Sequence, residues 1–275
     1  MSEQAQTFEP FANESAYIHL NERMVDRVLR RLGAMPTIRL LDLAAGTGLL
    51  TSIAYERAKD AGVRLLSTLL DLDLPALMQA RKEVTCDSAA YIFGTADHLP
   101  LKQTYDAVIF ANSLHLLDED AKAKALKESW RVLRPGGLLA MNTTFYEGAY
   151  PEESKPFYSR WIRRAIVEIN RRLPQRAKSE KAQAMEWLPA VGYKELIARA
   201  GFKILEMRER RVLLSQAAVR AICAYKEFAK GALHATDEDA NEASQALQVT
   251  VRQTFHDLQM KYLPRNWLEI VAVKA

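Results

Sequence analysis

The strongest constraint on the fold is a regular alternation of short apolar runs and helical segments between residues 38 and 145. Apolar runs of this length are typical of strands buried in a parallel sheet, and the segments between them have the apolar spacing of helices. This alternation implies right-handed crossovers and a parallel sheet with helices on both faces. Ligands of such sheets bind beyond the carboxyl ends of the strands, so the alternation also predicts where a site lies.

The apolar pattern predicts the individual elements of the chain. We expect strands at 38–43, 64–70, 90–93, 105–111, 138–145, 202–214 and 267–274. Helices are expected at 16–32, 49–61, 74–84, 119–133, 157–173, 193–200, 215–229 and 237–262. Gly33 and Gly201 follow two of these helices at positions where a residue that tolerates positive φ ends a helix. Pro135, Gly136 and Gly137 predict a turn before the fifth strand.

Composition excludes several classes of protein. The chain has 275 residues, of which 49% are hydrophobic and 26% are charged, enough for one core with an appended substructure. No apolar run approaches the length of a membrane span, and the N-terminus lacks the basic and apolar regions of a secretory signal. Two cysteines are too few for a disulfide framework or a zinc site, so we expect a cytoplasmic protein. The net charge of +4 is too weak to indicate nucleic-acid binding.

The turn after the first strand carries the strongest local signal. Residues 41–48 are Leu-Asp-Leu-Ala-Ala-Gly-Thr-Gly, and Gly46 and Gly48 lack the Cβ that would keep the backbone away from a ligand. Asp71 closes the second strand, where a carboxylate can accept hydrogen bonds from ribose hydroxyls. Thr51 stands where a pyrophosphate-binding loop has its third glycine. Two alternatives to this kind of ligand site stay open. The glycine turn could serve packing alone, or the chain could be a nicotinamide-dependent dehydrogenase.

Four further segments follow this loop in the order and spacing of class I S-adenosylmethionine-dependent methyltransferases. Residues 71–81 resemble the acid and helix of that family, and residues 94–100 resemble its adenine-side loop. Residues 105–115 resemble its fourth strand with the exit from it, and residues 130–137 resemble the turn before its fifth strand. The resemblance covers about residues 36–145. It implies an α/β fold, a three-layer, doubly wound, seven-stranded Rossmann-like sheet, with S-adenosylmethionine as cofactor and S-adenosylhomocysteine as product.

The resemblance also implies a set of cofactor-binding residues, namely Asp42, Ala44, Gly46, Thr47, Gly48, Asp71, Leu72, Ala96, Asp97 and Asn112. The loop would hold the methionine part of the cofactor, with Asp42 orienting the loop and Asn112 near the methionine end. Asp71 would bind the ribose, and Leu72 would pack on the adenine. The adenine edge would meet Ala96 and Asp97. Thr95 stands where many members carry an acid, so either Asp97 makes that contact or none does.

A general base is needed only if the methyl acceptor must lose a proton. His115, just beyond the fourth strand, is the first candidate because the pKa of histidine can lie near neutrality. The alternative is a structural histidine that contacts the cofactor or caps the next helix. Tyr17 is the second catalytic candidate, followed by His19, Tyr146 and Glu147. No cluster of cysteine and histidine has metal-ligand spacing, so no metal is expected.

Segments outside the sheet would cover the cofactor. We expect a core from 36–145, 190–214 and 266–275, an N-terminal helical cover at 1–35, and helical insertions at 146–189 and 215–265. In the family the last strand is antiparallel, which puts the ends of both insertions on the side of the cofactor and predicts a lid. Aromatic residues would line an apolar substrate pocket there, namely Tyr146, Phe157, Trp161, Tyr225 and Phe228. Alternatively, the apolar stripes of the inserted helices only pack on each other.

The function expected from the resemblance is methyl transfer to a small molecule, chiefly to oxygen of an apolar or mildly acidic biosynthetic metabolite, with nitrogen and carbon as other acceptors. The positive excess lies in residues 146–214, where it would attract an anionic substrate or an acidic carrier protein, or would only be solvated. Residues 111–114 lack the Asn/Asp-Pro-Pro-aromatic run of base-amino methyltransferases, and neither cysteine follows a proline, so a nucleic-acid substrate is not expected.

Two other functions and one question of assembly stay open. A protein or tRNA methyltransferase could dock through the arginine-rich helix at 157–173. A cofactor-binding assembly protein could have lost methyl transfer. Whether the chain forms a homodimer is also open.

Overall fold

The chain forms two compact units in a computed structural model that describes residues 8–86, 88–102, 104–176 and 187–275. The helical unit comprises residues 1–17, 147–187 and 211–266, and the sheet unit comprises residues 18–146, 188–210 and 267–275. Among the described residues, no helix has both the length and the apolar character needed to cross a membrane.

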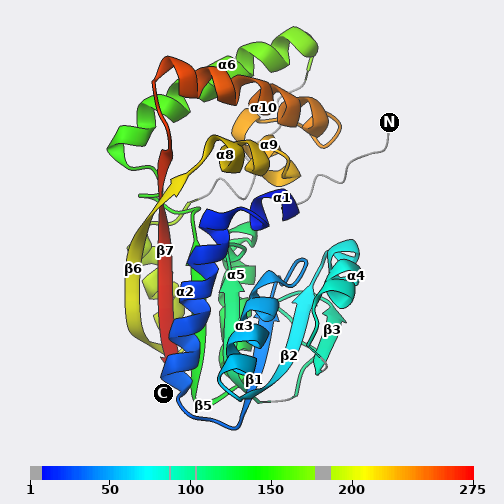
Figure 1. Cartoon of the computed structure of the whole chain (residues 1–275), viewed down its shortest axis with the longest axis vertical. Coiled ribbons are helices and arrows are strands. Elements are labelled where there is room, and N and C mark those ends of the chain that lie inside the picture. Colours follow the sequence, from blue (N-terminus) through cyan, green and yellow to red (C-terminus); the bar gives the residue numbers. More distant parts are fainter. Residues whose placement is uncertain (1–7, 87, 103, 177–186) are drawn as a thin grey trace. The chain divides into compact units, whose positions relative to one another are not determined.

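The chain contains a seven-stranded sheet with the strand order β3-β2-β1-β4-β5-β7-β6 (Figure 1). Its strands are β1 (Thr37–Leu43), β2 (Arg64–Asp71), β3 (Ala89–Phe93), β4 (Tyr105–Ala111), β5 (Leu133–Thr143), β6 (Phe202–Leu214) and β7 (Leu263–Lys274). Neighbouring strands from β3 to β5 are parallel, and β7 runs antiparallel to β5. The doubly wound α/β fold and the antiparallel last strand are therefore confirmed.

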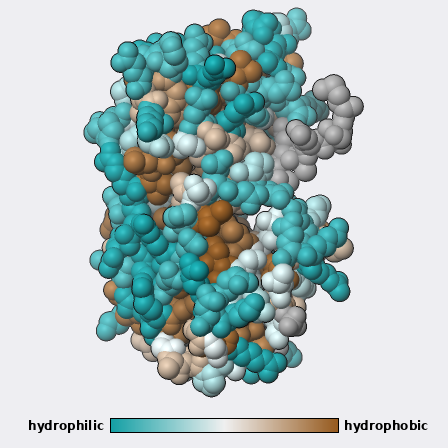
Figure 2. Space-filling model, viewed as in Figure 1, coloured by the Kyte–Doolittle hydropathy of each residue, from teal (hydrophilic) through white to brown (hydrophobic). Residues whose placement is uncertain are grey.

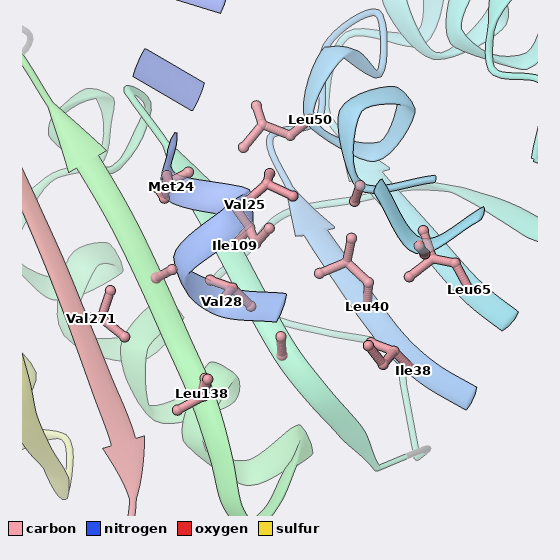
Figure 3. Close-up of a cluster of buried hydrophobic side chains, with 14 residues drawn as sticks. Met24, Val25, Val28, Ile38, Leu40, Leu50, Leu65, Ile109, Leu138 and Val271 are labelled. Atoms are coloured by element: carbon pink, nitrogen blue, oxygen red, sulfur yellow. The ribbon is translucent and has the colours of Figure 1, made fainter. Parts of the chain in front are cut away.

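Helices pack on this sheet through apolar stripes. They are α2 (Ser15–Leu32), α3 (Leu49–Asp60), α4 (Leu74–Glu83), α5 (Glu119–Val132) and α7 (Ala190–Arg199). The stripe of α2 contains Met24, Val25 and Val28, which meet strand residues such as Leu40 and Ile109 in one buried cluster (Figure 3). Each such side chain contributes about 1.5–3 kcal/mol when it leaves water, so this contact holds α2 and α3 against the sheet.

The predicted turn at 135–137 lies inside β5. Tyr105 of β4 pairs with Leu133, but Ala107 already pairs with Leu138, so the register shifts across these residues. A Cβ on Gly137 would lie 2.9 Å from the carbonyl oxygen of Arg134, which explains why glycine stands there. Pro135, Gly136 and Gly137 therefore interrupt the fifth strand, whereas we expected them to precede it.

The helical unit contains α1 (Glu9–Ala12), α6 (Lys155–Arg172), α8 (Gln216–Ile222), α9 (Lys226–Leu233) and α10 (Ala240–Asp257). The prediction of one helix at 215–229 is wrong, because Tyr225 is extended (φ −75°, ψ 119°) and separates α8 from α9. The rings of Phe157 and Phe255 lie 4.7 Å apart between α6 and α10. The indole N–H of Trp161 donates to the carbonyl of Leu247 at 3.0 Å.

Candidate cofactor site

The loop between β1 and α3 has an unusual backbone. Ala44, Gly46 and Gly48 have φ values of 52°, 55° and 83°, in the left-handed region that favours glycine. A Cβ on Gly48 would lie 2.5 Å from Val84 and 3.2 Å from Leu69, so this glycine serves packing. A Cβ on Gly46 would meet nothing within 4 Å. The two glycines therefore differ: Gly48 faces the protein core, and Gly46 faces open space where a ligand could lie.

Asp71 lies where three strand ends meet. Its Oδ2 accepts the N–H of Gly46 at 2.7 Å, and its Oδ1 accepts the N–H of Asp73 at 2.8 Å. Its carbonyl oxygen accepts the N–H of Gly94, just after β3, at 3.0 Å. Burial raises the pKa of the Asp71 carboxyl, and the backbone hydrogen bonds oppose that rise. Each carboxylate oxygen keeps a second lone pair that can accept a hydroxyl hydrogen.

Asp42 is buried beneath the same loop. Its Oδ2 accepts the hydroxyl hydrogen of Thr51 at 2.8 Å, and this bond links the end of β1 to the first turn of α3. Burial raises the pKa of Asp42 to about 7, against the lowering effect of Thr51. The negative charge of Asp71 also raises this pKa. The structure thus gives Asp42 a partner in Thr51, and its role in orienting the loop toward a cofactor stays a prediction.

The predicted adenine side combines an exposed apolar side chain with an anchored loop. Leu72 is 57% exposed, although it is a large hydrophobic residue next to Asp71. Ala96 is buried, and Asp97 is partly buried. The N–H of Leu99 donates to Glu128 of α5 at 2.9 Å, which fixes the end of the loop at 94–100.

The exits from β4 and β5 are joined by Asn112. This residue has a φ of 48°, its N–H donates to the carbonyl of Asn142 at 2.7 Å, and its Oδ1 accepts the N–H of Thr144 at 3.0 Å. His115 lies in the 3-10 turn Leu114–Leu116, is 2% exposed, and stacks on Phe145 with ring centroids 3.9 Å apart. The roles of both residues toward a ligand stay predictions.

The remaining predicted site residues divide between the units. Tyr146 is buried in the sheet unit. In the helical unit, Phe157 and Trp161 are almost fully buried, and Trp161 lies 6.1 Å from the ring of Phe228. Tyr17 and Tyr225 each lie 5.4 Å from Phe8. Packing within the helical unit accounts for the burial of Phe157 and Trp161, whereas Tyr225 and Phe228 are partly exposed.

Ion pairs engage much of the arginine-rich helix α6. Arg164 pairs with Asp257 of α10, and Arg171 pairs with Glu168 at 2.9 Å. Arg172 pairs with Glu168 at 2.8 Å and with Glu242 of α10 at 3.0 Å. These pairs give the positive charge of α6 a structural role within the helical unit.

The residues around the loop fit S-adenosylmethionine by the chemistry of their donors and acceptors. Asp71 offers acceptors for ribose hydroxyls, Leu72 offers an exposed apolar surface for adenine, and the backbone at Gly46 is open to a ligand. Within the described ranges, no group of three histidine, cysteine, aspartate or glutamate residues could hold a metal ion.

Sequence reasoning gave too little weight to three residues. Thr51 was noted only for departing from the dinucleotide pattern, yet it holds Asp42. Phe145 stacks on His115, and its place just after β5 was a usable signal because strand ends of a parallel sheet meet. Phe8 joins Tyr17 and Tyr225, which are too far apart in the sequence for any local pattern to connect.

Comparison with known proteins agrees with this geometry. Residues 40–137 match the family model described as a methyltransferase domain. A ubiquinone/menaquinone biosynthesis C-methyltransferase from Ruegeria sp. is 33% identical over 46% of this chain and 50% of its own length. A malonyl-[acyl-carrier protein] O-methyltransferase from Enterobacter lignolyticus is 30% identical over 54% of this chain and 59% of its own length. The chain thus spans about half the length of these relatives.

A solved structure extends the likeness in fold to most of the chain. A protein from Bacillus halodurans C-125 assigned as a methyltransferase superposes with a TM-score of 0.57 over 91% of this chain and 98% of its own. Its sequence is 14% identical, so it supports the fold alone. Fold, loop and family model agree: residues 40–137 are similar to a methyltransferase domain, and the sheet has the fold of class I S-adenosylmethionine-dependent methyltransferases.

Proposed function

We propose that this chain transfers the methyl group of S-adenosylmethionine to a small-molecule acceptor, chiefly to oxygen of an apolar or mildly acidic metabolite. The observation that carries the proposal is the hydrogen bond between Asp71 and Gly46. It brings an acidic side chain and an open backbone loop together at the carboxyl ends of β1 and β2, where ligands of such sheets bind. The names of the relatives support the general kind of reaction.

The residues of the chain would position the cofactor and accept the proton that the methyl acceptor loses. S-adenosylmethionine supplies an electrophilic methyl group when it is bound. The loop at 44–48 and Asp71 would hold the methionine and ribose parts of the cofactor. Holding two reactants in a reactive arrangement supplies much of the rate of such a displacement. A hydroxyl acceptor would lose its proton to a ring nitrogen of His115 as the new bond forms.

We assign acceptor binding to the helical unit. Tyr225 and Phe228 are partly exposed aromatic residues in α9 and at its start, and Tyr17 and Tyr225 share contacts with Phe8. Aromatic side chains of this kind suit an apolar acceptor. The proposed lid role of this unit rests on the topology of the chain.

A carrier-bound acceptor is the second candidate within the same reaction. Three relatives are named malonyl-[acyl-carrier protein] O-methyltransferases, at 27–32% identity over about half of this chain. Their acceptor, by name, is malonyl-[acyl-carrier protein]. A mildly acidic acceptor on an acidic carrier protein would use the same cofactor site.

Labelled S-adenosylmethionine tests both candidates in one design. The protein is incubated with the labelled cofactor and a metabolite extract, and in parallel with malonyl-acyl carrier protein, and labelled products are identified by mass spectrometry. The matched control is Asp71→Ala. Label in a small molecule supports the first candidate, and label on the carrier-bound acceptor supports the second. Tight cofactor binding with no labelled product in either arm would indicate a cofactor-binding assembly protein instead.

A further inference from the structure

A groove lined by arginines lies in the sheet unit, away from the cofactor loop. Its volume is about 390 Å³, and its lining residues are Arg23, Asp26, Arg27, Arg30 and Arg31 of α2 and Glu206, Arg208 and Arg210 of β6. Figure 2 shows a hydrophilic surface over this part of the molecule. The groove shares no residue with the predicted cofactor site.

Secondary structure puts these arginines on one surface. On α2, positions 23, 27 and 30 are spaced by three and four residues, so they share a face, while Met24 and Val28 point into the core. On β6, residues 206, 208 and 210 alternate with their neighbours and therefore share a face of the strand. The groove is thus built by regular elements of the sheet unit.

Carboxylates neutralise only part of this charge. Glu206 pairs with Arg31 at 2.7 Å and with Arg208 at 2.8 Å. The buried Glu269 of β7 pairs with Arg27 at 2.7 Å and with Arg210 at 2.9 Å. Asp26 pairs with Arg57, which lies outside the groove, at 3.0 Å. Six arginines therefore line a space whose own lining offers two carboxylates.

Two arginines of the groove stand outside this charge network. Arg27 belongs to the network: its side chain is 8% exposed, its Nη2 lies 2.7 Å from Oε2 of Glu269, and its Nη1 lies 3.6 Å from Oε1 of Glu206. Arg23 and Arg30 are exposed and form no ion pair with any described residue.

We propose that this groove binds a small polyphosphate-type anion. All of its basic side chains are arginines and none is a lysine. The planar guanidinium fork matches two oxygens of a phosphoryl group, whereas an ammonium group acts as a point charge. Several arginines around one space suit a ligand with several adjacent phosphoryl groups, and the volume suits a small molecule. Arg23 and Arg30 supply the unpaired charge, beside Arg31, Arg208 and Arg210 of the same lining.

Titration with tripolyphosphate tests the proposal on the full chain. The variant is Arg23→Gln with Arg30→Gln, because both side chains are exposed and their loss leaves the buried network intact. The matched control is Lys124→Gln with Lys127→Gln, two exposed lysines on α5 of the same unit. Calorimetry should show one bound tripolyphosphate per chain, with affinity reduced at least tenfold in the arginine variant and changed less than twofold in the lysine variant.

Three results would overturn the proposal. Equal affinity in the arginine variant would show that the anion binds elsewhere. If sodium sulfate at the same ionic strength raised the thermal midpoint as much as tripolyphosphate does, the effect would be general screening of charge. Binding of a short single-stranded RNA through the same arginines, with no binding of tripolyphosphate, would place the phosphoryl groups on a nucleic acid. A second measurement, the unliganded thermal midpoint, confirms that each variant is folded.

Discussion

The backbone N–H of Gly46 donates a hydrogen bond of 2.7 Å to Oδ2 of Asp71, across 25 positions in the sequence. The contact joins the loop that follows β1 to the last residue of β2. One carboxylate thus holds the loop in place and faces the region where we expect the ribose. A change at Asp71 is therefore expected to act on loop geometry and on cofactor contacts together, whereas changes at the glycines can separate stability from binding.

Gly48→Ala should destabilise the protein more than Gly46→Ala does. At Gly48 the added methyl group would lie 2.5 Å from Val84 at a φ of 83°, and we expect a loss of about 2–4 kcal/mol in the free energy of unfolding. At Gly46 only the left-handed backbone opposes alanine, which costs about 1–2 kcal/mol. Urea unfolding of the two variants checks the order.

Binding of S-adenosylmethionine should depend on Gly46, although its replacement costs less stability. The Gly46→Ala protein is expected to fold but to bind S-adenosylmethionine at least tenfold more weakly, because its methyl group would project into the open space beside the loop. Calorimetry on the folded variant measures this. Unchanged affinity would mean that the cofactor does not approach Gly46.

Asp42→Asn should stabilise the protein increasingly as pH rises. The pKa of Asp42 is about 7 in the folded protein and about 4 in an unfolded chain. Between these values the unfolded chain has released a proton that the folded protein keeps, so the stability of the unmodified protein falls as pH rises and becomes level above about pH 7. Asparagine has no proton to release and can still accept the hydrogen bond from Thr51.

Thermal and urea unfolding at pH 5 and pH 8 check this dependence. The gain in unfolding free energy from Asp42→Asn should be larger at pH 8 by about 1–3 kcal/mol. Thr51→Val is the companion variant, since it removes the hydroxyl that lowers the pKa of Asp42. A gain that is equal at both pH values would show that Asp42 is ionised in the folded protein throughout this range.

His115→Ala should lower kcat and leave the affinity for S-adenosylmethionine nearly unchanged. If His115 is the base, the loss should be about 100-fold or more, and the acidic limb of the pH profile of kcat should disappear. Phe145→Leu is the control, because it removes the stacked ring and keeps the imidazole. An equal loss of kcat in both variants, with the pH profile intact, would assign His115 a positioning role.

The fold was predictable because its signals are local. The strand at 105–111 and the strand at 202–214 follow from runs of apolar and alternating residues, and both have the predicted bounds in the structure. The break at Tyr225 was not predictable from periodicity, because apolar or aromatic residues recur every three residues across it, at Val219, Ile222, Tyr225 and Phe228. Apolar spacing reports which face is buried and is insensitive to a short interruption of the helix.

The site was predictable only in part, because its contacts are distant in sequence. Glycine and aspartate at the strand ends predicted a cofactor loop at this place, but not that the N–H of Gly46 donates to Asp71. The groove beside α2 depends on Glu206 and Glu269, which lie far along the chain from Arg27. Such ion pairs depend on which elements become neighbours in the sheet, so no local pattern contains them.

The most direct test of the central claim is calorimetric titration of S-adenosylmethionine into the unmodified protein and into the Asp71→Ala and Asp97→Ala variants. We predict one binding site per chain in the unmodified protein and an affinity at least tenfold weaker in Asp71→Ala. Asp97→Ala tests the predicted contact at the adenine edge and should have the smaller effect. No binding by the unmodified protein, or equal affinity in the folded Asp71→Ala variant, would contradict the assignment of the loop and Asp71 to the cofactor.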